Sequence, residues 1–415
     1  MRIFVVLDGI GDRPCKALKN LTPLQYAETP NLDYFASKAT HGYVYTIKEN
    51  IAPESDEAIL ALLGYDPQKY YYGRGPLEAF GSGMEFKNGD LALRANFATI
   101  DKNGKIIDRR VGRSLSTDEA LELEKAINSG VNLGYPFKFK ATVGHRGVLV
   151  IKGNFSDNVS NVDPAYKKVG RFGVAVTDAE NKIRISRPLD PDKNTKLTAN
   201  VINEFVNQSQ EILKNHPINK KRNGKYLLEA NCILLRDAGT ILPELPQKYN
   251  WGAVVSMPLE IGIAKLAGMK VLSFENPENK SNDIYENLYV SLNKAIDISI
   301  KKLKEVKYQN YFIHFKETDI PGHDNKPKEK VKMIELIDKK FFKFLRTLKN
   351  MELVVTGDHT TSCELKGHSN DPVPLIHFKE NEKGDIIDRF NEVESIEGSY
   401  EKLYGKEVLK TVGFE

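Results

Sequence analysis

The sequence predicts an α/β protein: a mostly parallel sheet flanked by helices, with a smaller α/β or α+β domain inserted into it. Short apolar stretches alternate with amphipathic ones in the first and last parts of the chain, as in βα units. A Gly-rich and Pro-containing middle part interrupts this alternation. The chain has 415 residues, too many for a single hydrophobic core, so we expect two domains.

The N-terminal part begins with an apolar stretch, IFVVLD at 3–8, which predicts a buried strand. A Thr-Pro pair then opens a helix over 31–39, because proline is favoured in the first helical turn. A second strand follows at 43–47, and a helix over 55–64 ends in glycine. This part therefore reads as two βα units.

The C-terminal part repeats the alternation. We expect helices at 255–268, 284–305 and 326–347, and strands in KVLSF and at 311–315, 353–358 and 374–378. The middle part differs, with strands at 91–100 and 147–151 separated by polar segments. We therefore expect residues 1–73 and 251–415 to form one discontinuous domain, and 74–250 an inserted one.

Composition excludes several classes of protein. Sixty basic residues against 56 acidic ones give a net charge of +4, which predicts a mixed surface and no nucleic-acid partner. No apolar run approaches the roughly 20 residues of a membrane helix, and the N-terminus does not resemble a signal peptide. We therefore expect a cytoplasmic protein. Its three cysteines are distant in sequence, so we expect neither a disulfide framework nor a cysteine zinc site.

Aspartates and histidines gather where predicted strands end. The set comprises Asp8, Asp319 with His323, Asp358 with His359, and His368. Ligands collect at the carboxyl ends of parallel strands, and two divalent cations would suit these nitrogen and oxygen groups. The alternative is a set of turn caps and surface loops.

Ser55 is the candidate nucleophile because it begins a predicted helix. Backbone N–H groups and the helix dipole can hold a phosphoryl group there, and metal coordination would activate the hydroxyl. The alternative for Ser55 is a helix N-cap.

Together these segments resemble the cofactor-independent, or 2,3-bisphosphoglycerate-independent, phosphoglycerate mutases in their archaeal form, within the alkaline phosphatase superfamily. The resemblance runs nearly end to end. Its matching stretches are LDGIGDRPCKALKNLTPLQYAETPNLD (7–33), GYDPQKYYYGRGPLEAFGSG (64–83), LALRANFAT (91–99), DRRVGR (108–113), GHRGVLVIKG (144–153), NVDP (161–164), ILLRDAG (233–239), HFKETDIPGHD (314–324) and TGDHTTSCELKGHSNDPVPLI (356–376).

The resemblance implies an alkaline-phosphatase-like fold and a role for each site residue. One metal would be held by Asp319, His323 and His368, and the other by Asp8, Ser55, Asp358 and His359. Manganese is the metal expected first, with zinc, cobalt or magnesium as alternatives. The inserted domain would bind substrate through Arg110, Arg113, His145, Arg146 and Arg236, with Asp163 as a possible general base.

The implied activity is the interconversion of 3-phosphoglycerate and 2-phosphoglycerate through a phosphoserine on Ser55, as in glycolysis and gluconeogenesis. It needs neither 2,3-bisphosphoglycerate nor a nucleotide. The expected partner is this small substrate, with no nucleic acid and no membrane, for a monomer or homo-oligomer. The alternatives are a metal-dependent phosphatase or phosphonate hydrolase of the same superfamily, and a non-catalytic paralogue.

Three features depart from the family pattern. Glu54 stands where a small residue is common, and Glu260 where a helix often carries lysine. The segment ENPENKSND (275–283) replaces a turn rich in glycine. A carboxylate beside a phosphoryl group is unfavourable unless it points away or binds a cation. These departures bear on the substrate pocket and leave the expected metal ligands in place.

Overall fold

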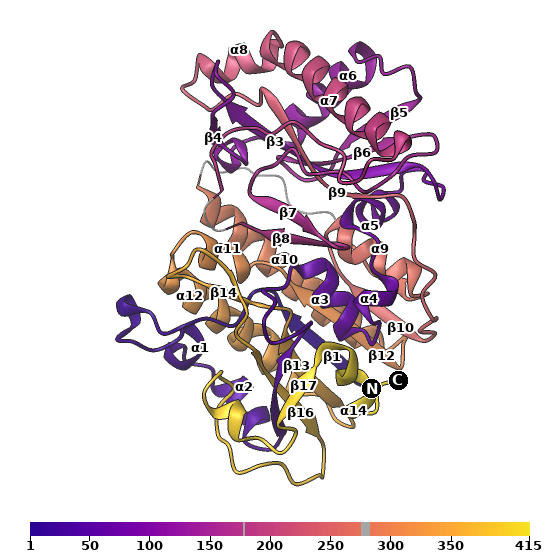
Figure 1. The fold of residues 1–415 in the computed structure, drawn as a ribbon. Coiled ribbons are helices and arrows are strands. Elements are labelled where there is room, and N and C mark those ends of the chain that lie inside the picture. The colour runs from indigo at the N-terminus through magenta and orange to yellow at the C-terminus, as the bar shows by residue number, and fades with distance from the viewer. Residues whose placement is uncertain (177–178, 275–282) are drawn as a thin grey trace.

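The computed structural model describes residues 1–176, 179–274 and 283–415, so most of the departing segment 275–283 lies outside the described residues. Its largest element is an eight-stranded sheet (Figure 1). The strand order is β11 (Lys270–Val271), β10 (Trp251–Val254), β12 (Asn310–Phe315), β1 (Arg2–Leu7), β13 (Glu352–Gly357), β16 (Val373–Lys379), β2 (Thr40–Tyr45) and β17 (Lys402–Tyr404). Only β16 runs antiparallel to its neighbours, so the predicted α/β class with a mostly parallel sheet is confirmed.

Both faces of this sheet are covered, which explains why β1 is apolar throughout. Ile3 and Val5 point into one core, which contains residues of α10 and α12, and Phe4 and Val6 into the other, which contains residues of α3 and α9. The helices around this sheet are α1 (Pro23–Tyr26), α2 (Pro30–Ala36), α3 (Ser55–Leu62), α4 (Pro67–Tyr70), α5 (Arg74–Gly81), α9 (Pro258–Leu266), α10 (Ile284–Glu305), α11 (Asp319–His323), α12 (Pro327–Ile337), α13 (Lys343–Leu345) and α14 (Val408–Thr411). A π-helical turn, Asp338–Phe342, joins α12 to α13.

A second sheet lies in the upper part of Figure 1 and is antiparallel. Its strands are β3 (Leu91–Ile100), β4 (Ile106–Asp108), β5 (Phe137–Ala141), β6 (Arg146–Ile151) and β9 (Cys232–Gly239). The helices α6 (Thr117–Gly130), α7 (Lys193–Lys214) and α8 (Pro217–Asn223) lie in the same part, and α6 and α7 contribute to the apolar core of this sheet. We propose the division 1–73 with 251–415, and 74–250, as the two domains.

Two glycines bring the helices at this boundary into close contact. A Cβ atom on Gly81 of α5 would lie 1.8 Å from the Pro258 carbonyl oxygen of α9, and one on Gly262 would lie 2.1 Å from that of Leu77. No side chain fits at these distances, so α5 and α9 pack backbone against backbone. Two hairpins complete the fold, β7 (Tyr166–Val169) with β8 (Phe172–Ala175) and β14 (Thr360–Ser362) with β15 (Gly367–Ser369). No helix in the described ranges has the length and apolar character to cross a membrane.

A fully buried ammonium group ties the loop after β1 to β14. Lys330 Nζ donates to the carbonyl oxygens of Gly11 and Thr361, at 3.0 and 2.9 Å, and to Asp12 Oδ2 at 2.9 Å. The thiols of Cys15 and Cys363, distant in sequence, lie beside Asp12 in the same cluster and are free. The ammonium group therefore neutralises the one carboxylate of this cluster.

We expect Lys330→Met to lower the free energy of unfolding by about 3–5 kcal/mol, because it leaves Asp12 charged and buried without its partner. Adding Asp12→Asn should recover part of this loss, since the uncompensated charge is then gone. Denaturant unfolding of the three variants measures both effects. A double variant that loses the sum of the single losses would contradict this explanation.

Candidate active site

The carboxyl ends of three neighbouring strands meet at one edge of the large sheet. Leu7, the last residue of β1, pairs with Phe315 of β12 on one side and with Gly357 of β13 on the other. The next residues, Asp8 and Asp358, are therefore adjacent, and both are fully buried. Because the three strands are parallel and in register, the residues that follow them lie together although they are far apart in sequence.

Gly9 allows Asp319 and Thr361 to lie close to the strand ends. Its φ is +59°, and a Cβ atom there would lie 2.5 Å from Thr361 Oγ1 and 2.8 Å from Asp319 Oδ1. Its N–H donates to Asp358 Oδ1 at 2.9 Å. Any larger residue would separate Asp319 from the strand ends, so glycine is required here.

The first ligand group consists of Asp319, His323 and His368, whose ligand atoms all lie within 4.8 Å of one another. Asp319 was expected directly at a strand end, and this was wrong: it lies beyond the strand. The strand β12 ends at Phe315, and Asp319 and His323 lie on α11, a short helix whose i,i+4 spacing puts both side chains on one face. His323 Nε2 lies 3.4 Å from Asp319 Oδ2, and His368 Nε2 lies 3.7 Å from Asp319 Oδ1.

The second group consists of Asp8, Ser55, Asp358 and His359. His359 Nε2 lies 3.3 Å from Asp8 Oδ1, 3.4 Å from Asp358 Oδ2 and 3.2 Å from Ser55 Oγ. Within the described residues, Asp8 Oδ1 and Asp358 Oδ2 are buried and accept no hydrogen bond. Burial raises the pKa of both carboxyl groups, and the neighbouring Asp8 helps to raise that of Asp358 well above its ordinary value. Buried carboxylate oxygens without donors fit a site for a divalent cation.

The two groups are contiguous. One oxygen each of Asp8 and Asp319 and one ring nitrogen of His359 also lie within 4.8 Å of one another. The rings of His359 and His368 stack with their centroids 3.8 Å apart. The structure thus brings all seven predicted metal ligands into one cluster.

Each of the three histidines directs its Nε2 inward, because its Nδ1 has an oxygen partner. His368 Nδ1 lies 2.8 Å from the Pro53 carbonyl oxygen, and His323 Nδ1 lies 3.2 Å from that of Lys366. Thr361 Oγ1 donates to Asp319 Oδ1 at 2.7 Å and lies 3.0 Å from His359 Nδ1, from which it can accept. These outer contacts leave Nε2 of all three rings to bind a cation. They involve backbone oxygens and a threonine, which sequence reasoning did not identify.

Without a cation, His368 carries a proton. Burial lowers its pKa, but Glu54 and Asp319 outweigh that effect and raise it to about 10. Glu54 Oε1 lies 3.4 Å from His368 Nδ1. A cation that binds at Nε2 therefore has to displace a proton.

Ser55 is the first residue of α3, and Glu54 is the N-cap. The alternative in which Ser55 is only an N-cap is therefore wrong: the capping position falls one residue earlier. Ser55 is buried, and its Oγ faces the second ligand group across 3.2 Å. The positive end of the helix dipole and the free N–H groups of the first turn lie at the same place.

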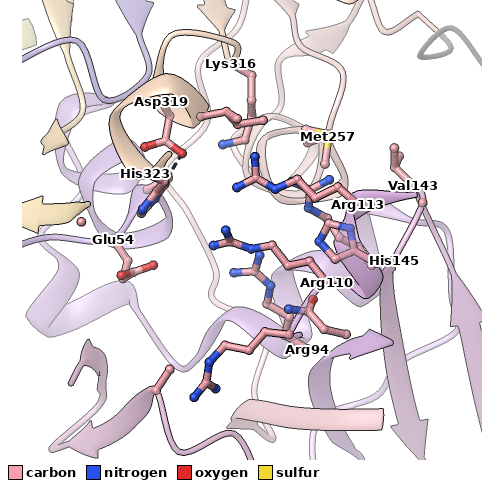
Figure 2. Close-up of a pocket in the computed structure, with 18 of the residues that line it drawn as sticks. Glu54, Arg94, Arg110, Arg113, Val143, His145, Met257, Lys316, Asp319 and His323 are labelled. Atoms are coloured by element: carbon pink, nitrogen blue, oxygen red, sulfur yellow. Dashed lines mark ion pairs between the residues drawn. The ribbon is translucent and has the colours of Figure 1, made fainter. Parts of the chain in front are cut away.

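Opposite the ligand groups, positive side chains line a cavity of about 610 Å³. Figure 2 shows Arg94, Arg110 and Arg113 on one side of this cavity and Asp319 with His323 on the other. All the predicted substrate residues line it, namely Arg110, Arg113, His145, Arg146, Arg236 and Asp163. Sequence reasoning missed Arg74, Arg94, Arg109 and Lys316, which line it too.

These positive groups repel one another. Burial and Arg94 lower the pKa of Arg146 to about 9, and burial and Arg236 lower that of Arg94 to about 10. Burial and Arg146 lower the pKa of His145 well below its ordinary value. A bound anion would relieve this repulsion, so the wall is suited to a ligand with several negative charges.

Asp163 is buried between two of these arginines. Its Oδ1 accepts from Arg109 Nη1 and from the Ala165 N–H, and its Oδ2 accepts from Arg236 Nη1 at 3.3 Å. Both oxygens of the predicted general base are thus engaged by cationic donors, which stabilise its ionised form.

Comparisons with known proteins agree with this geometry. A family model described as 2,3-bisphosphoglycerate-independent phosphoglycerate mutase matches residues 36–219. The chain is 40% identical to the enzyme of that name from Aeropyrum pernix, over 97% of this chain and 96% of that one, and 39% identical to that from Pyrococcus furiosus, over 98% and 95%.

Two solved structures are similar along almost the whole chain. A Pyrococcus horikoshii protein has a TM-score of 0.74 at 30% identity, covering 99% of this chain and 96% of that one. A cofactor-independent phosphoglycerate mutase from Thermoplasma acidophilum has a TM-score of 0.56 at 31% identity, covering 99% and 98%.

We expect Asp358→Asn to leave the chelator-treated protein at least as stable as the parent, because it removes a buried charge and keeps the Oδ1 that accepts from Gly9. The gain in stability on adding Mn²⁺ should fall, since that gain is about 2.7 kcal/mol at a hundredfold excess over Kd and shrinks as Kd rises. Thermal unfolding with and without Mn²⁺ measures both. An equal Mn²⁺ gain in parent and variant would contradict the assignment of Asp358 as a ligand.

Proposed function

This chain belongs to the 2,3-bisphosphoglycerate-independent phosphoglycerate mutase family and interconverts 3-phosphoglycerate and 2-phosphoglycerate, and we propose that it does so through a phosphoserine on Ser55. The observation that carries the proposal is the position of Ser55 Oγ, 3.2 Å from His359 Nε2 within a cluster of buried carboxylates. A cavity lined by arginines faces the same hydroxyl. Nucleophile, cation ligands and anion-binding groups thus meet at one point.

We assign one divalent cation to Asp319, His323 and His368, and a second to Asp8, Ser55, Asp358 and His359. Manganese is the proposed metal, although zinc, cobalt and magnesium suit the same nitrogen and oxygen donors. Bound there, the cations would lower the pKa of the Ser55 hydroxyl and neutralise charge on the transferring phosphoryl group.

The reaction divides into two transfers at one site. Ser55 Oγ gives up its proton and attacks the phosphorus of 3-phosphoglycerate in line; its bond to phosphorus forms, the bond to the substrate O3 breaks, and O3 takes up a proton. Glycerate then turns within the cavity. Its O2 loses a proton and attacks the phosphoserine, and Oγ leaves with the electrons of the broken bond and takes a proton back. The phosphoryl group moves from O3 to O2, and no nucleotide is consumed.

The arginine wall has two tasks in this scheme. Arg110, Arg113, Arg146 and Arg236, with His145, hold the carboxylate and phosphate of the substrate. They also retain glycerate between the two transfers, when water at the phosphoserine would convert the mutase into a phosphatase. We propose that the 74–250 domain closes over the site at this stage.

Asp163 is the proposed base for the glycerate hydroxyl. Its carboxylate lies on the cavity wall, where Arg109 and Arg236 hold it. Arg109 is the more exposed of the two, with 24% of its side chain accessible against 6% for Arg236. We therefore propose that Arg109 moves onto the substrate and releases Asp163 Oδ1 to accept the proton.

The decisive experiment is a coupled assay for 2-phosphoglycerate, with 3-phosphoglycerate and Mn²⁺ present and 2,3-bisphosphoglycerate absent. We expect turnover by the parent protein and a phosphoryl adduct in its intact mass, and neither with Ser55→Ala, because no other hydroxyl takes this place. Release of free phosphate without 2-phosphoglycerate would favour the hydrolase alternative. Absence of any adduct would favour the non-catalytic one.

We expect Arg110→Met to raise KM for 3-phosphoglycerate by about 10- to 100-fold, since a hydrogen bond to a charged group contributes roughly 1.5–3 kcal/mol. The affinity for Mn²⁺ should not change, because Arg110 belongs to the opposite wall. Arg187→Met at an exposed position is the matched control, with unchanged KM. Steady-state kinetics of both variants tests this; equal KM values would remove Arg110 from the substrate site.

A further inference from the structure

Lys316 lies between two carboxylates at the floor of the cavity. Its Nζ donates to Asp8 Oδ2 and lies 3.5 Å from Glu260 Oε1. Its side chain lines the cavity and is 21% exposed, whereas both carboxylates are at most 1% exposed. The ammonium group is therefore the only one of the three charges that reaches the space where a substrate binds.

The proposed mechanism assigns no role to Glu260. It lies in the first turn of α9, and within the described residues neither of its carboxylate oxygens accepts a hydrogen bond. Its partner of opposite charge is Lys316, and the ring of His314 lies beside it, with Nδ1 3.6 Å from Oε1. A carboxylate buried without donors is unfavourable, so its retention here indicates a task that needs a negative charge.

A cation bound at Asp8 would weaken the hold of this carboxylate on Lys316. Asp8 is one of the proposed ligands: its Oδ1 faces His359 and its Oδ2 holds the Lys316 ammonium group. A divalent cation and an ammonium group on one carboxylate repel each other strongly at this depth. This repulsion favours a shift of the ammonium group toward Glu260 Oε1, which lies 3.5 Å from it.

We propose that Glu260 is a positioning residue that receives the Lys316 ammonium group when a divalent cation occupies the Asp8 group. The ammonium group neutralises Asp8 in the cation-free protein. After the exchange it pairs with Glu260 and stays at the cavity floor, directed toward the phosphoryl group of the substrate. This inference rests on the proposed assignment of Asp8 as a cation ligand.

Calorimetric titration of chelator-treated protein with Mn²⁺ tests the exchange without reference to activity. Lys316→Met removes the competing charge, and we expect tighter binding at the Asp8 group, by about tenfold. Glu260→Gln removes the acceptor, and binding should weaken by roughly 10- to 100-fold. In the Lys316→Met background the same Glu260→Gln change should matter by less than about threefold, because no ammonium group is left to receive.

The double-variant cycle separates this role from a general electrostatic one. If Glu260 acted only as a nearby negative charge, Glu260→Gln would weaken binding equally in both backgrounds, and the proposal would be overturned. An unchanged affinity in Lys316→Met would overturn it as well. Glu317→Gln is the matched control, because Glu317 is a buried carboxylate on the same cavity that is bound instead by Ser291 Oγ at 2.7 Å; its Mn²⁺ affinity should stay within about threefold.

Folding of each variant is checked by thermal unfolding. If Glu260→Gln does not fold, Glu260→Asp keeps the charge but withdraws it, and it should weaken Mn²⁺ binding only where Lys316 is present. Tight Mn²⁺ binding with additive variants would refute the exchange and leave the proposed function intact. Absence of any Mn²⁺ binding to the parent protein would refute both.

Discussion

The crowding of three carboxylates at one sheet edge is the constraint on which the rest of this structure depends. Asp8 and Asp358 lie side by side because β1 and β13 are parallel, and both are fully buried, whereas Asp319 joins them from α11 with 17% of its side chain exposed. An ion buried without a partner costs several kcal/mol. The Gly9 N–H, the Thr361 hydroxyl and the Lys316 ammonium group offset part of this cost. Burial still raises the pKa of Asp8 and of Asp358, and the neighbouring acids raise it further. The strand register therefore creates a place that favours a cation.

The side of the cavity opposite the carboxylates is lined by arginines and has an excess of positive charge. Arg94 and Arg146 lie among other cations, and burial together with this repulsion lowers their pKa values. A phosphoglycerate ion in the cavity would relieve the repulsion among the arginines, and cations held by the carboxylates would attract its phosphate. The backbone contact of α5 with α9 holds Arg74, the first residue of α5, next to the helices around the large sheet. Charge complementarity therefore favours a small, highly charged substrate.

Local pattern was sufficient to predict the most regular elements and the strands that Asp8 and Asp358 follow. The strand at 91–100 and the helix at 284–305 have the predicted bounds, since their periodicity is uninterrupted. Asp8 and Asp358 were found because they follow apolar strands, and the structure places them there. The helix α11, which carries Asp319 and His323, was not predicted, because nothing in HFKETDIPGH indicates so short a helix. A helix of five residues has too little periodicity to detect.

The cationic wall was only partly predictable. The sequence does mark Arg94, because it is a charged residue in a largely apolar strand, β3. Arg74 and Arg109, in contrast, look like ordinary surface residues in sequence. Their function follows from tertiary packing that brings α5, β3 and the segment after β4 around one cavity. The contacts that orient the histidines were beyond sequence reasoning altogether, because two of them are backbone carbonyl oxygens. Such positions carry no residue preference that a single sequence could reveal.

The two glutamates that depart from the family pattern now have a physical account. Burial raises the pKa of Glu54, but His368 and Arg236 outweigh it and hold that pKa low, so the carboxylate is ionised and paired. Glu54 therefore meets the condition under which an acid beside a phosphoryl group is tolerated, namely a cationic partner. The same holds for Glu260, where Lys316 and His314 outweigh the effect of burial on its pKa. Each departure therefore places a negative charge next to a positive one, His368 for Glu54 and Lys316 for Glu260, so neither carboxylate stands unpaired beside the proposed phosphoryl site.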